Sequence, residues 1–174
     1  MISIVAGTNR DNANSLILAN IYQGLLDKLG AENQIIDLTD LPHDFIQTAL
    51  YDQAGKNVDF NPIREAMLNS EKFAFIVPEY NGGFPGVLKT FIDGLKYPDT
   101  FTGKKAAMVG LSSGVQGGGL ALSHLTDILN YCGTHVVALK PKLSRINHHL
   151  VDGEITDPLY KQLLEEQAKM LVDF

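Results

Sequence analysis

Donors suited to holding an anion are concentrated near the N-terminus, in the stretch from Gly7 to Ser15 (G-T-N-R-D-N-A-N-S). This stretch follows a short apolar run and precedes a helical pattern, and the first amides of a helix have no partner within it. Side chains that can also donate to phosphate oxygens are those of Thr8, Arg10, Asn14 and Ser15. Each alone is equally typical of a turn or a helix cap, and Asn14 or Ser15 suits the N-cap position. As a set they predict a phosphate site.

The commoner phosphate loops do not occur in the chain. Neither G-x-G-x-x-G nor G-x-x-x-x-G-K-[ST] can be found. Asp37, at the end of the second apolar run, has the place of the ribose-binding acid of a dinucleotide fold. Without the glycine fingerprint, we interpret it as a surface carboxylate.

Two later loops also follow apolar runs and could surround a ligand. One runs from Pro78 to Gly86 (P-E-Y-N-G-G-F-P-G) and the other from Ser112 to Gly119 (S-S-G-V-Q-G-G-G). Glycine lets the backbone approach a flat ligand closely and adopt a positive φ. The second of these loops, taken alone, is explained equally well as an ordinary flexible turn.

The elements that position these loops alternate along the chain, which predicts βαβ units around a parallel sheet. The expected strands are Ile2–Ala6, Gln34–Leu38, Lys72–Val77, Ala106–Leu111 and His135–Leu139. The expected helices are Ser15–Leu29, Pro62–Ser70, Val87–Lys96, Leu120–Tyr131 and Pro158–Val172. Right-handed crossovers between five strands favour an α/β, flavodoxin-like three-layer sandwich with a five-stranded parallel sheet of order 2-1-3-4-5. Ligands of such sheets lie at the carboxyl ends of the strands where the order reverses, here between strands one and three.

A long mixed stretch, Thr39 to Asn61, separates the second strand from the second helix. We interpret it as an excursion near the active face or as a subunit contact. The chain shows no internal repeat, low-complexity tract or shift of composition. Residues 1–174 are therefore expected to form a single domain, a size at which one core suffices.

The second loop and the helix after it carry a longer pattern. From Pro78 to Asp93 the chain reads P-E-Y-N-G-x-x-P-G-x-L-K-x-x-I-D. This pattern resembles the flavin-binding signature of the NADPH-dependent FMN reductase family, a flavodoxin-like group that includes quinone, azo-dye and chromate reductases. Gly94, which follows it, stands where members of that family commonly carry tryptophan.

The first loop resembles the same family's G-[ST]-x-R-x-x-S-x-[NS] motif, with matches at Gly7, Thr8, Arg10 and Ser15. Ala13 stands where a serine is usual, so one phosphate hydroxyl is missing. The third loop, from Ser112, is similar to the family's glycine-rich segment beside the flavin.

The resemblance implies an FMN-dependent enzyme that passes hydride from NADPH, or NADH, through bound flavin to a small acceptor such as a quinone, an azo compound, a flavin or a metal oxyanion. Because the flavin carries the chemistry, no catalytic side chain is assigned. Backbone amides near Asn81 and Gly82 are expected to donate to the N5 and O4 edge of the ring. The residues expected to bind the cofactor are Thr8, Arg10, Asn14, Ser15, Leu16, Pro78, Glu79, Tyr80, Asn81, Gly82, Ser112, Ser113, Gly114 and Gly117.

The resemblance also implies a homodimer or homotetramer with the flavin near the interface and the helix Val87–Lys96 as a contact. A non-enzymatic, flavodoxin-type electron carrier is the first alternative, and the open glycine-rich loops favour the enzyme over it. A relative that binds another phosphorylated ligand without redox chemistry is the second alternative, because of Ala13.

Composition narrows the partners and the compartment. The 14 basic and 20 acidic side chains give a formal charge of −6 without a basic stripe, which argues against a nucleic-acid partner. No apolar run approaches the roughly 20 residues that span a bilayer, so no membrane insertion is expected. The single cysteine, Cys132, and the lack of a leader pattern favour the cytoplasm. His148, His149 and Asp152 cluster in the sequence, but adjacent histidines in a loop seldom converge on a metal, and no metal site is expected.

Overall fold

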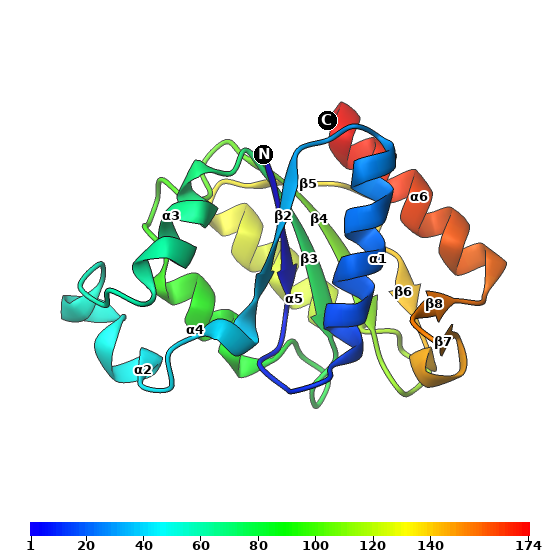
Figure 1. The fold of residues 1–174 in the computed structure, drawn as a ribbon, viewed down its shortest axis with the longest axis horizontal. Helices are drawn as coiled ribbons and strands as arrows, with labels where there is room; N and C mark the ends of the chain where they lie inside the picture. The colour runs from blue at the N-terminus through cyan, green and yellow to red at the C-terminus, as the bar shows by residue number, and fades with distance from the viewer.

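A parallel sheet forms the centre of the fold in the computed structural model, which describes all residues from 1 to 174. Its strands are β1 (Ile2–Ala6), β2 (Asn33–Asp37), β3 (Lys72–Pro78), β4 (Lys105–Leu111) and β5 (His135–Val136). The order β2-β1-β3-β4-β5 confirms the predicted 2-1-3-4-5 arrangement (Figure 1). Every pairing within it is parallel.

Helices cover both faces of the sheet, which completes the predicted three-layer α/β sandwich (Figure 1). One face carries α1 (Asn14–Lys28) and α6 (Pro158–Asp173), and the other carries α3 (Asn61–Asn69), α4 (Gly86–Gly94) and α5 (Gly119–Tyr131). The core is accordingly divided into two clusters of buried residues, one on each side of the sheet.

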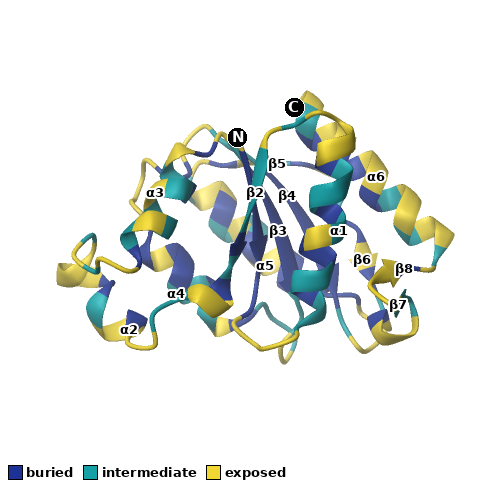
Figure 2. Ribbon diagram, viewed as in Figure 1, coloured by how far each residue is buried: buried dark blue, intermediate teal, exposed yellow.

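Strand β3 shows how the sheet serves both cores. Phe73, Phe75 and Val77 belong to the cluster under α3, α4 and α5, whereas Ala74 and Ile76 belong to the cluster under α1 and α6. Side chains alternate between the faces of a strand, so a strand covered on both sides is apolar along nearly its whole length. Figure 2 shows this burial along the central strands. Burial on both faces explains why these strands can be recognised in the sequence as continuous apolar runs.

The fifth strand differs from the prediction, which was wrong for its second half. Only His135 and Val136 pair with β4 as β5, opposite Lys105 and Ala106. The chain pairs with β4 again at β6 (Lys142–Leu143), where Lys142 stands opposite Gly110. Residues 137–141 therefore lie opposite residues 107–109, which leaves two more residues on this strand than on β4. This is a bulge, and bulges re-aim the chain that follows them.

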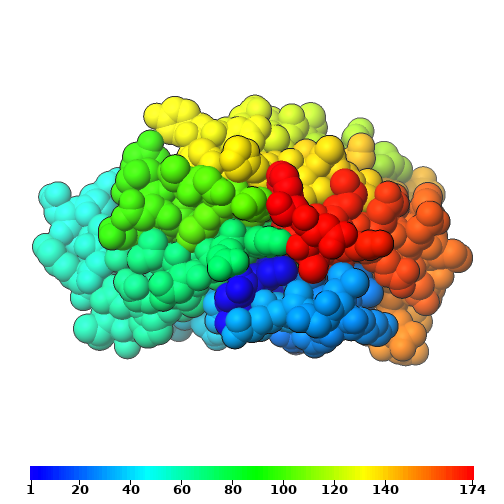
Figure 3. All heavy atoms as spheres, turned by 90° about the horizontal axis from the view of Figure 1, so that it is seen from above, coloured from blue at the N-terminus to red at the C-terminus, as the bar shows by residue number.

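A side chain from the last helix occupies the gap that the bulge opens. Gln167 of α6 is fully buried, and its Nε2 donates to the carbonyl oxygens of Met108 at 2.9 Å and of Leu139 at 2.7 Å. Its Oε1 accepts from the Tyr22 hydroxyl at 3.2 Å, and burial raises the pKa of Tyr22 above its ordinary value. Figure 3 shows α6, in red, lying beside the blue N-terminal part of the chain. The Leu139 carbonyl thus bonds to Gln167, 28 positions further along the chain, instead of to the neighbouring strand β4.

The long stretch after β2 is a set of short helical turns. It contains a 3₁₀ turn at Leu38–Asp40, α2 (Phe45–Thr48) and a second 3₁₀ turn at Tyr51–Gln53. Phe45 anchors it, with its ring centroid 4.6 Å from that of Phe60. A Cβ on Gly94 would lie only 2.8 Å from Cζ of Phe45, so glycine at the family's tryptophan position makes room for this ring.

The chain between β6 and α6 forms a small excursion of its own. It contains a 3₁₀ turn at Ile146–His148 and an antiparallel hairpin of β7 (Leu150–Val151) and β8 (Glu154–Ile155). Asp157 caps α6 by accepting from two of its first amides. Among the helices, none combines the length and the apolar character needed to cross a membrane.

Candidate functional site

A polar pocket of about 430 Å³ opens at the carboxyl ends of β1, β3 and β4. Four of its 15 lining residues are hydrophobic. The lining residues come from four chain segments: Thr8 and Arg10 to Ser15, Pro78 to Tyr80, Leu111 to Ser113, and Ile146 with Asn147. The pocket lies where the strand order reverses between β1 and β3, the place at which open parallel sheets bind ligands.

The first loop presents a row of free backbone donors. Gly7 fixes its start, because the Gly7 amide donates to the Ile76 carbonyl at 2.9 Å and a Cβ there would come within 2.7 Å of the same oxygen. From Asn9 to Ser15 no backbone N–H donates to an acceptor within the chain. These amides and the positive end of the α1 dipole favour an anion.

The N-cap of α1 is Ala13, so the prediction that Asn14 or Ser15 caps this helix was wrong. Ala13 has extended backbone angles, and no side chain accepts from the first turn. Asn14 and Ser15 already lie within the helix. A serine or aspartate cap would have occupied one of the first amides. With alanine there, the amides of Asn14 and Ser15 stay available to an external acceptor.

The side chains of the first loop differ in how far they are committed to other contacts. Thr8 is 3% exposed, and its Oγ1 lies 2.9 Å from the Tyr80 hydroxyl. Ser15 is 1% exposed, and its Oγ has no hydrogen-bond partner. Arg10 is exposed and forms no ion pair. Buried hydroxyls are rarely left unpaired, so Ser15 lacks an acceptor that an anion could supply.

The second loop is a tight hairpin turn. The backbones of Tyr80 and Gly83 exchange hydrogen bonds of 2.8 and 3.0 Å, and Asn81 and Gly82 between them have φ values of 52° and 78°. Two consecutive positive φ angles define the turn that Asn-Gly favours. The amides of Asn81 and Gly82 donate to nothing within the chain. The turn therefore leaves two donors free at the rim of the pocket.

Glu79, at the start of that turn, is also incompletely satisfied. Its amide donates to the Leu111 carbonyl at 2.9 Å, which continues the pairing of β3 with β4. Its Oε2 is buried without a partner. The pocket thus contains an unpaired hydrogen-bond donor, the Ser15 hydroxyl of the first loop, and an unpaired acceptor, the Glu79 carboxylate oxygen of the second.

The third loop organises itself through Ser112. The Ser112 hydroxyl donates to the Gly114 carbonyl at 3.0 Å and accepts from the Gly117 amide at 2.9 Å. Gly117 is buried, and a Cβ there would lie 2.8 Å from the backbone of Lys142. Ser112 and Gly117 shape the loop, while the neighbouring Ser113 is exposed at the pocket.

A fourth segment, Ile146 and Asn147, lines the pocket although the sequence analysis did not propose it. The amides of Arg145 and Ile146 donate to the carbonyls of Gly114 at 2.7 Å and Ser112 at 3.0 Å, which joins this segment to the third loop. Asn14 donates to Oδ1 of Asn147 at 2.8 Å. The only feature of the sequence that could have indicated this segment is its position. It follows the last strand of the sheet and so lies at the carboxyl edge, with the other three loops.

The structure therefore divides the predicted cofactor residues into two groups. Those that line the pocket are Thr8, Arg10, Asn14, Ser15, Pro78, Glu79, Tyr80, Ser112 and Ser113. Those that lie beside it are Leu16, Asn81, Gly82, Gly114 and Gly117. Leu16 packs against the core under α1. No residue of the stretch from 39 to 60 reaches the pocket.

The histidine cluster after β6 does not assemble into a metal site. No three His, Cys, Asp or Glu side chains converge anywhere in the chain in a way that could hold an ion. Nδ1 of His149 lies 3.7 Å from Oδ2 of Asp157, and the His149 ring meets the edge of Tyr160.

A parallel sheet of this order, with a donor-rich loop entering a helix at its switch point, defines the flavodoxin-like class of α/β proteins. Two-electron reduced Megasphaera elsdenii flavodoxin superimposes with a TM-score of 0.62 at 17% identity, covering 97% of this chain and 99% of that one. The family model for NADPH-dependent FMN reductase matches residues 1–143, and the chain belongs to this family.

Individual relatives agree with the family. An NAD(P)H-dependent FMN reductase from Pseudomonas aeruginosa is 29% identical over 151 residues, which is 82% of this chain and 77% of the relative. A 2-hydroxy-1,4-benzoquinone reductase from Burkholderia is 28% identical over 137 residues, 75% of this chain and 70% of the relative. The flavoenzyme FerB, an NAD(P)H:acceptor oxidoreductase from Paracoccus denitrificans, has a TM-score of 0.80 at 25% identity over 99% of this chain and 94% of its own.

Membership of the family makes this protein an oxidoreductase of the NAD(P)H-dependent FMN reductase type. Its cofactor is FMN, and its co-substrate is NAD(P)H. The resemblance to this family that the sequence indicated is therefore confirmed.

Proposed function

We propose that FMN binds in the polar pocket and passes hydride from NADPH, or NADH, to a small electron acceptor. The observation that carries this proposal is the set of unsatisfied groups in the first loop: free amides from Asn9 to Ser15 and the buried, unpaired Oγ of Ser15. They are donors without acceptors at the N-terminus of a helix, the chemistry that a phosphomonoester satisfies. The residues present therefore fit the cofactor of the family.

The phosphate end of the site is formed by the first loop. Ser15, Thr8 and the loop amides donate to phosphate oxygens, and the exposed guanidinium of Arg10 supplies a countercharge. Asn14 is shared between this end and its partner Asn147. Ala13 supplies no hydroxyl, but as an uncharged, non-accepting cap it leaves the amides of Asn14 and Ser15 free.

The ring end of the site is formed by the second and third loops. Pro78, Glu79 and Tyr80 line it, and the free amides of Asn81 and Gly82 are placed to donate to the edge of the ring. Donors there favour the electron-rich reduced ring. When bound, the flavin supplies the hydride chemistry, and the chain's task is to hold and expose it.

The remaining predicted residues act on the shape of this end. The Ser112 hydroxyl is hydrogen-bonded to both Gly114 and Gly117, and these bonds set the course of the third loop, which places Ser113 at the pocket. Leu16 holds the first turn of α1 against the core.

The acceptor we favour is flat and partly apolar, as a quinone is. Val115 and Leu120 are 66% and 57% exposed, and a Cβ on Gly82 would lie 3.9 Å from Cδ1 of Leu120, which places this leucine beside the turn. Neither residue lines the pocket, so the apolar surface that they offer lies beside it, and an acceptor with an apolar part would cover that surface. The Burkholderia relative's name, a benzoquinone reductase, supports the same class, while azo compounds, free flavin and metal oxyanions are the other acceptors to test.

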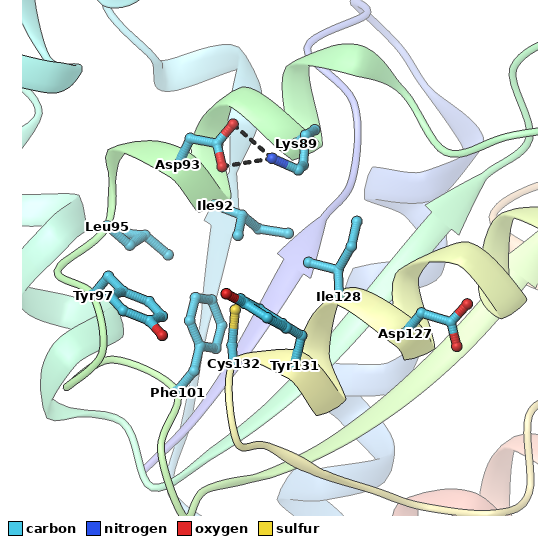
Figure 4. A pocket seen from close by; sticks show the side chains of 10 residues that line it. All are labelled: Lys89, Ile92, Asp93, Leu95, Tyr97, Phe101, Asp127, Ile128, Tyr131 and Cys132. Carbon is cyan, nitrogen blue, oxygen red and sulfur yellow. Dashed lines mark hydrogen bonds and ion pairs between the residues drawn. The ribbon is translucent and has the colours of Figure 1, made fainter.

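We also propose that the chain forms a homodimer through the groove between α4 and α5, with a tetramer as a further step. The groove has a volume of about 440 Å³, and seven of its ten lining residues are hydrophobic. Figure 4 shows Tyr97 and Tyr131 flanking Phe101 and Cys132, with the Lys89–Asp93 ion pair at the rim. Tyr131 is 82% exposed and Tyr97 is 67% exposed. Because α4 starts directly after the second loop, such an interface would lie next to the flavin.

Cys132 belongs to this groove and not to the pocket. Burial raises the pKa of its thiol, so the thiol is a poor nucleophile at neutral pH. A free, protonated cysteine suits the reducing cytoplasm that we propose as the location. We further propose that residues 1–174 act as one FMN-binding domain, because both core clusters are built on the same sheet.

The experiment that tests the function is an anaerobic titration. Purified protein reconstituted with FMN is expected to show a flavin spectrum and to bleach on addition of NADPH or NADH, and a benzoquinone is expected to restore the colour. Protein that binds FMN but bleaches with neither nicotinamide would contradict the enzyme and support an electron carrier. Protein that binds no FMN would contradict the site itself.

A further inference from the structure

The hydroxyls of Thr8 and Tyr80 form a pair that joins the first and second loops. Their oxygens are 2.9 Å apart, and the two residues are separated by 72 positions in the sequence. Thr8 is almost fully buried, while Tyr80 is 39% exposed. Both line the polar pocket. The contact is therefore a link between the loop assigned to the phosphate and the turn assigned to the ring.

Either oxygen of this pair could be the donor, but an anion in the pocket decides between them. A hydroxyl has one hydrogen to donate and can accept from others. A phosphate dianion offers only acceptors, so Thr8 must direct its hydrogen to the anion. The hydrogen between Thr8 and Tyr80 must then come from Tyr80. The order of donation becomes Tyr80 to Thr8 to phosphate, and donors arranged in a chain polarise and strengthen one another.

We propose that Tyr80 is a positioning residue for the phosphate end of the site, acting through Thr8. This inference rests on the proposed function, in which FMN binds here with its phosphate in the first loop. Tyr80 fixes the Thr8 hydroxyl as a donor toward the phosphate. In return, the phosphate orients Tyr80. Because Tyr80 is the first residue of the hairpin turn that ends at Gly83, the turn is oriented with it. The phosphate thereby orders the ring-binding turn.

A different role for Tyr80 would be to cover the flavin ring with its own ring. The two roles differ in the part of the ligand that they contact, the ring or the phosphate. A covering ring contributes equally to FMN and to riboflavin, which share the isoalloxazine and the ribityl chain. A hydroxyl acting through Thr8 contributes only when the phosphate is present. Riboflavin is therefore the ligand that separates them.

The test compares the dissociation constants of FMN and riboflavin, measured by fluorescence quenching, for the wild type, Tyr80→Phe, Thr8→Val and the double variant. Tyr80→Phe is expected to weaken FMN binding by about 3- to 10-fold, the effect of one net hydrogen bond, and to leave riboflavin binding within about 2-fold of wild type. Thr8→Val is expected to cost more for FMN, and the double variant is expected to match Thr8→Val because the tyrosine acts only through the threonine. Tyr51→Phe removes an exposed hydroxyl outside the pocket and should change neither constant.

Three results would overturn the inference: equal losses for FMN and riboflavin in Tyr80→Phe, no loss for either, or losses that add fully in the double variant. Thermal unfolding of each variant checks that the fold is intact, and Tyr80→Phe keeps the ring and its packing. Wild-type protein that binds neither ligand would overturn the proposed function and this inference with it. Wild-type protein that binds FMN while Tyr80→Phe behaves as wild type would overturn this inference alone.

Discussion

The side-chain amide of Asn14 donates to Oδ1 of Asn147 over 2.8 Å, which joins the start of α1 to the 3₁₀ turn after β6. The two residues are 133 positions apart. Asn147 lies beyond the residues 1–143 that match the family. The pocket is thus lined in part by a segment outside the matched residues, and this pair joins that segment to the first loop.

Asn147→Ala should shorten the residence of FMN. The loss of one exposed hydrogen bond is expected to raise the dissociation rate about 2- to 5-fold while the association rate stays the same, because the wall opens while the loop amides, Ser15 and Arg10 are unchanged. Stopped-flow fluorescence measures both rates. Asn20→Ala, which removes an exposed amide on the outside of α1, is the matched control. An unchanged dissociation rate would show that the pair does not close the pocket.

Ala13→Asp should separate stability from cofactor binding. An aspartate at the N-cap accepts from the first turn of α1 and is expected to raise the free energy of unfolding by about 1 kcal/mol. The same carboxylate occupies the amides and repels the phosphate, so FMN affinity should fall more than about 10-fold. Urea unfolding and FMN titration measure the two effects. Ala13→Ser, a cap without charge, is the comparison and should retain FMN. If Ala13→Asp binds FMN as tightly as the wild type does, the phosphate lies elsewhere.

Arg10→Ala should weaken FMN binding and should also make the FMN affinity less sensitive to salt. The guanidinium is exposed and has no carboxylate partner, so it is free to pair with the phosphate. A loss of about 10-fold is expected at low ionic strength, shrinking as salt screens the wild-type contact. Titrations at several salt concentrations measure it. Lys28→Ala removes a cation from the far end of α1 and serves as the control. Equal salt dependence in Arg10→Ala and wild type would contradict the assignment.

Gln167→Leu should destabilise the protein strongly. The leucine leaves the carbonyls of Met108 and Leu139 and the hydroxyl of Tyr22 buried without partners. The expected loss in the free energy of unfolding is about 2–4 kcal/mol. Gln162→Leu, at an exposed position of the same helix, should cost little. Equal urea midpoints for these two variants would show that the bulge needs no such support.

Tyr131→Glu should disrupt the proposed dimer. A charge placed in the apolar groove between α4 and α5 cannot be buried without a large cost in desolvation. Sedimentation velocity is expected to show wild-type dimers and Tyr131→Glu monomers at the same concentration. Leu159→Glu, at another exposed apolar position, on α6, is the control and should leave the dimer intact. A monomeric wild type would exclude the interface.

Much of the first and second loops could be predicted from the sequence because their chemistry is local. Free helix amides follow from the start of a helix, and Asn81 with Gly82 defines a turn with two positive φ angles whatever surrounds it. The five strands and their order follow from apolar runs separated by helical patterns, since a sheet covered on both faces makes its central strands mostly apolar. The N-cap was missed because alanine carries no capping signal.

What the sequence determined by itself was thus the class of fold, the family and the chemistry of the two loops that we propose bind FMN. Only the tertiary structure decided how the pocket closes. The bulge after β5 depends on Gln167 of α6, and the wall at Asn147 and the pair of Thr8 with Tyr80 depend on residues far apart in the chain. Such contacts have no period and no fixed spacing. They exist because folding around the sheet brings together loops and helices from distant parts of the chain, whose polar groups must then satisfy one another.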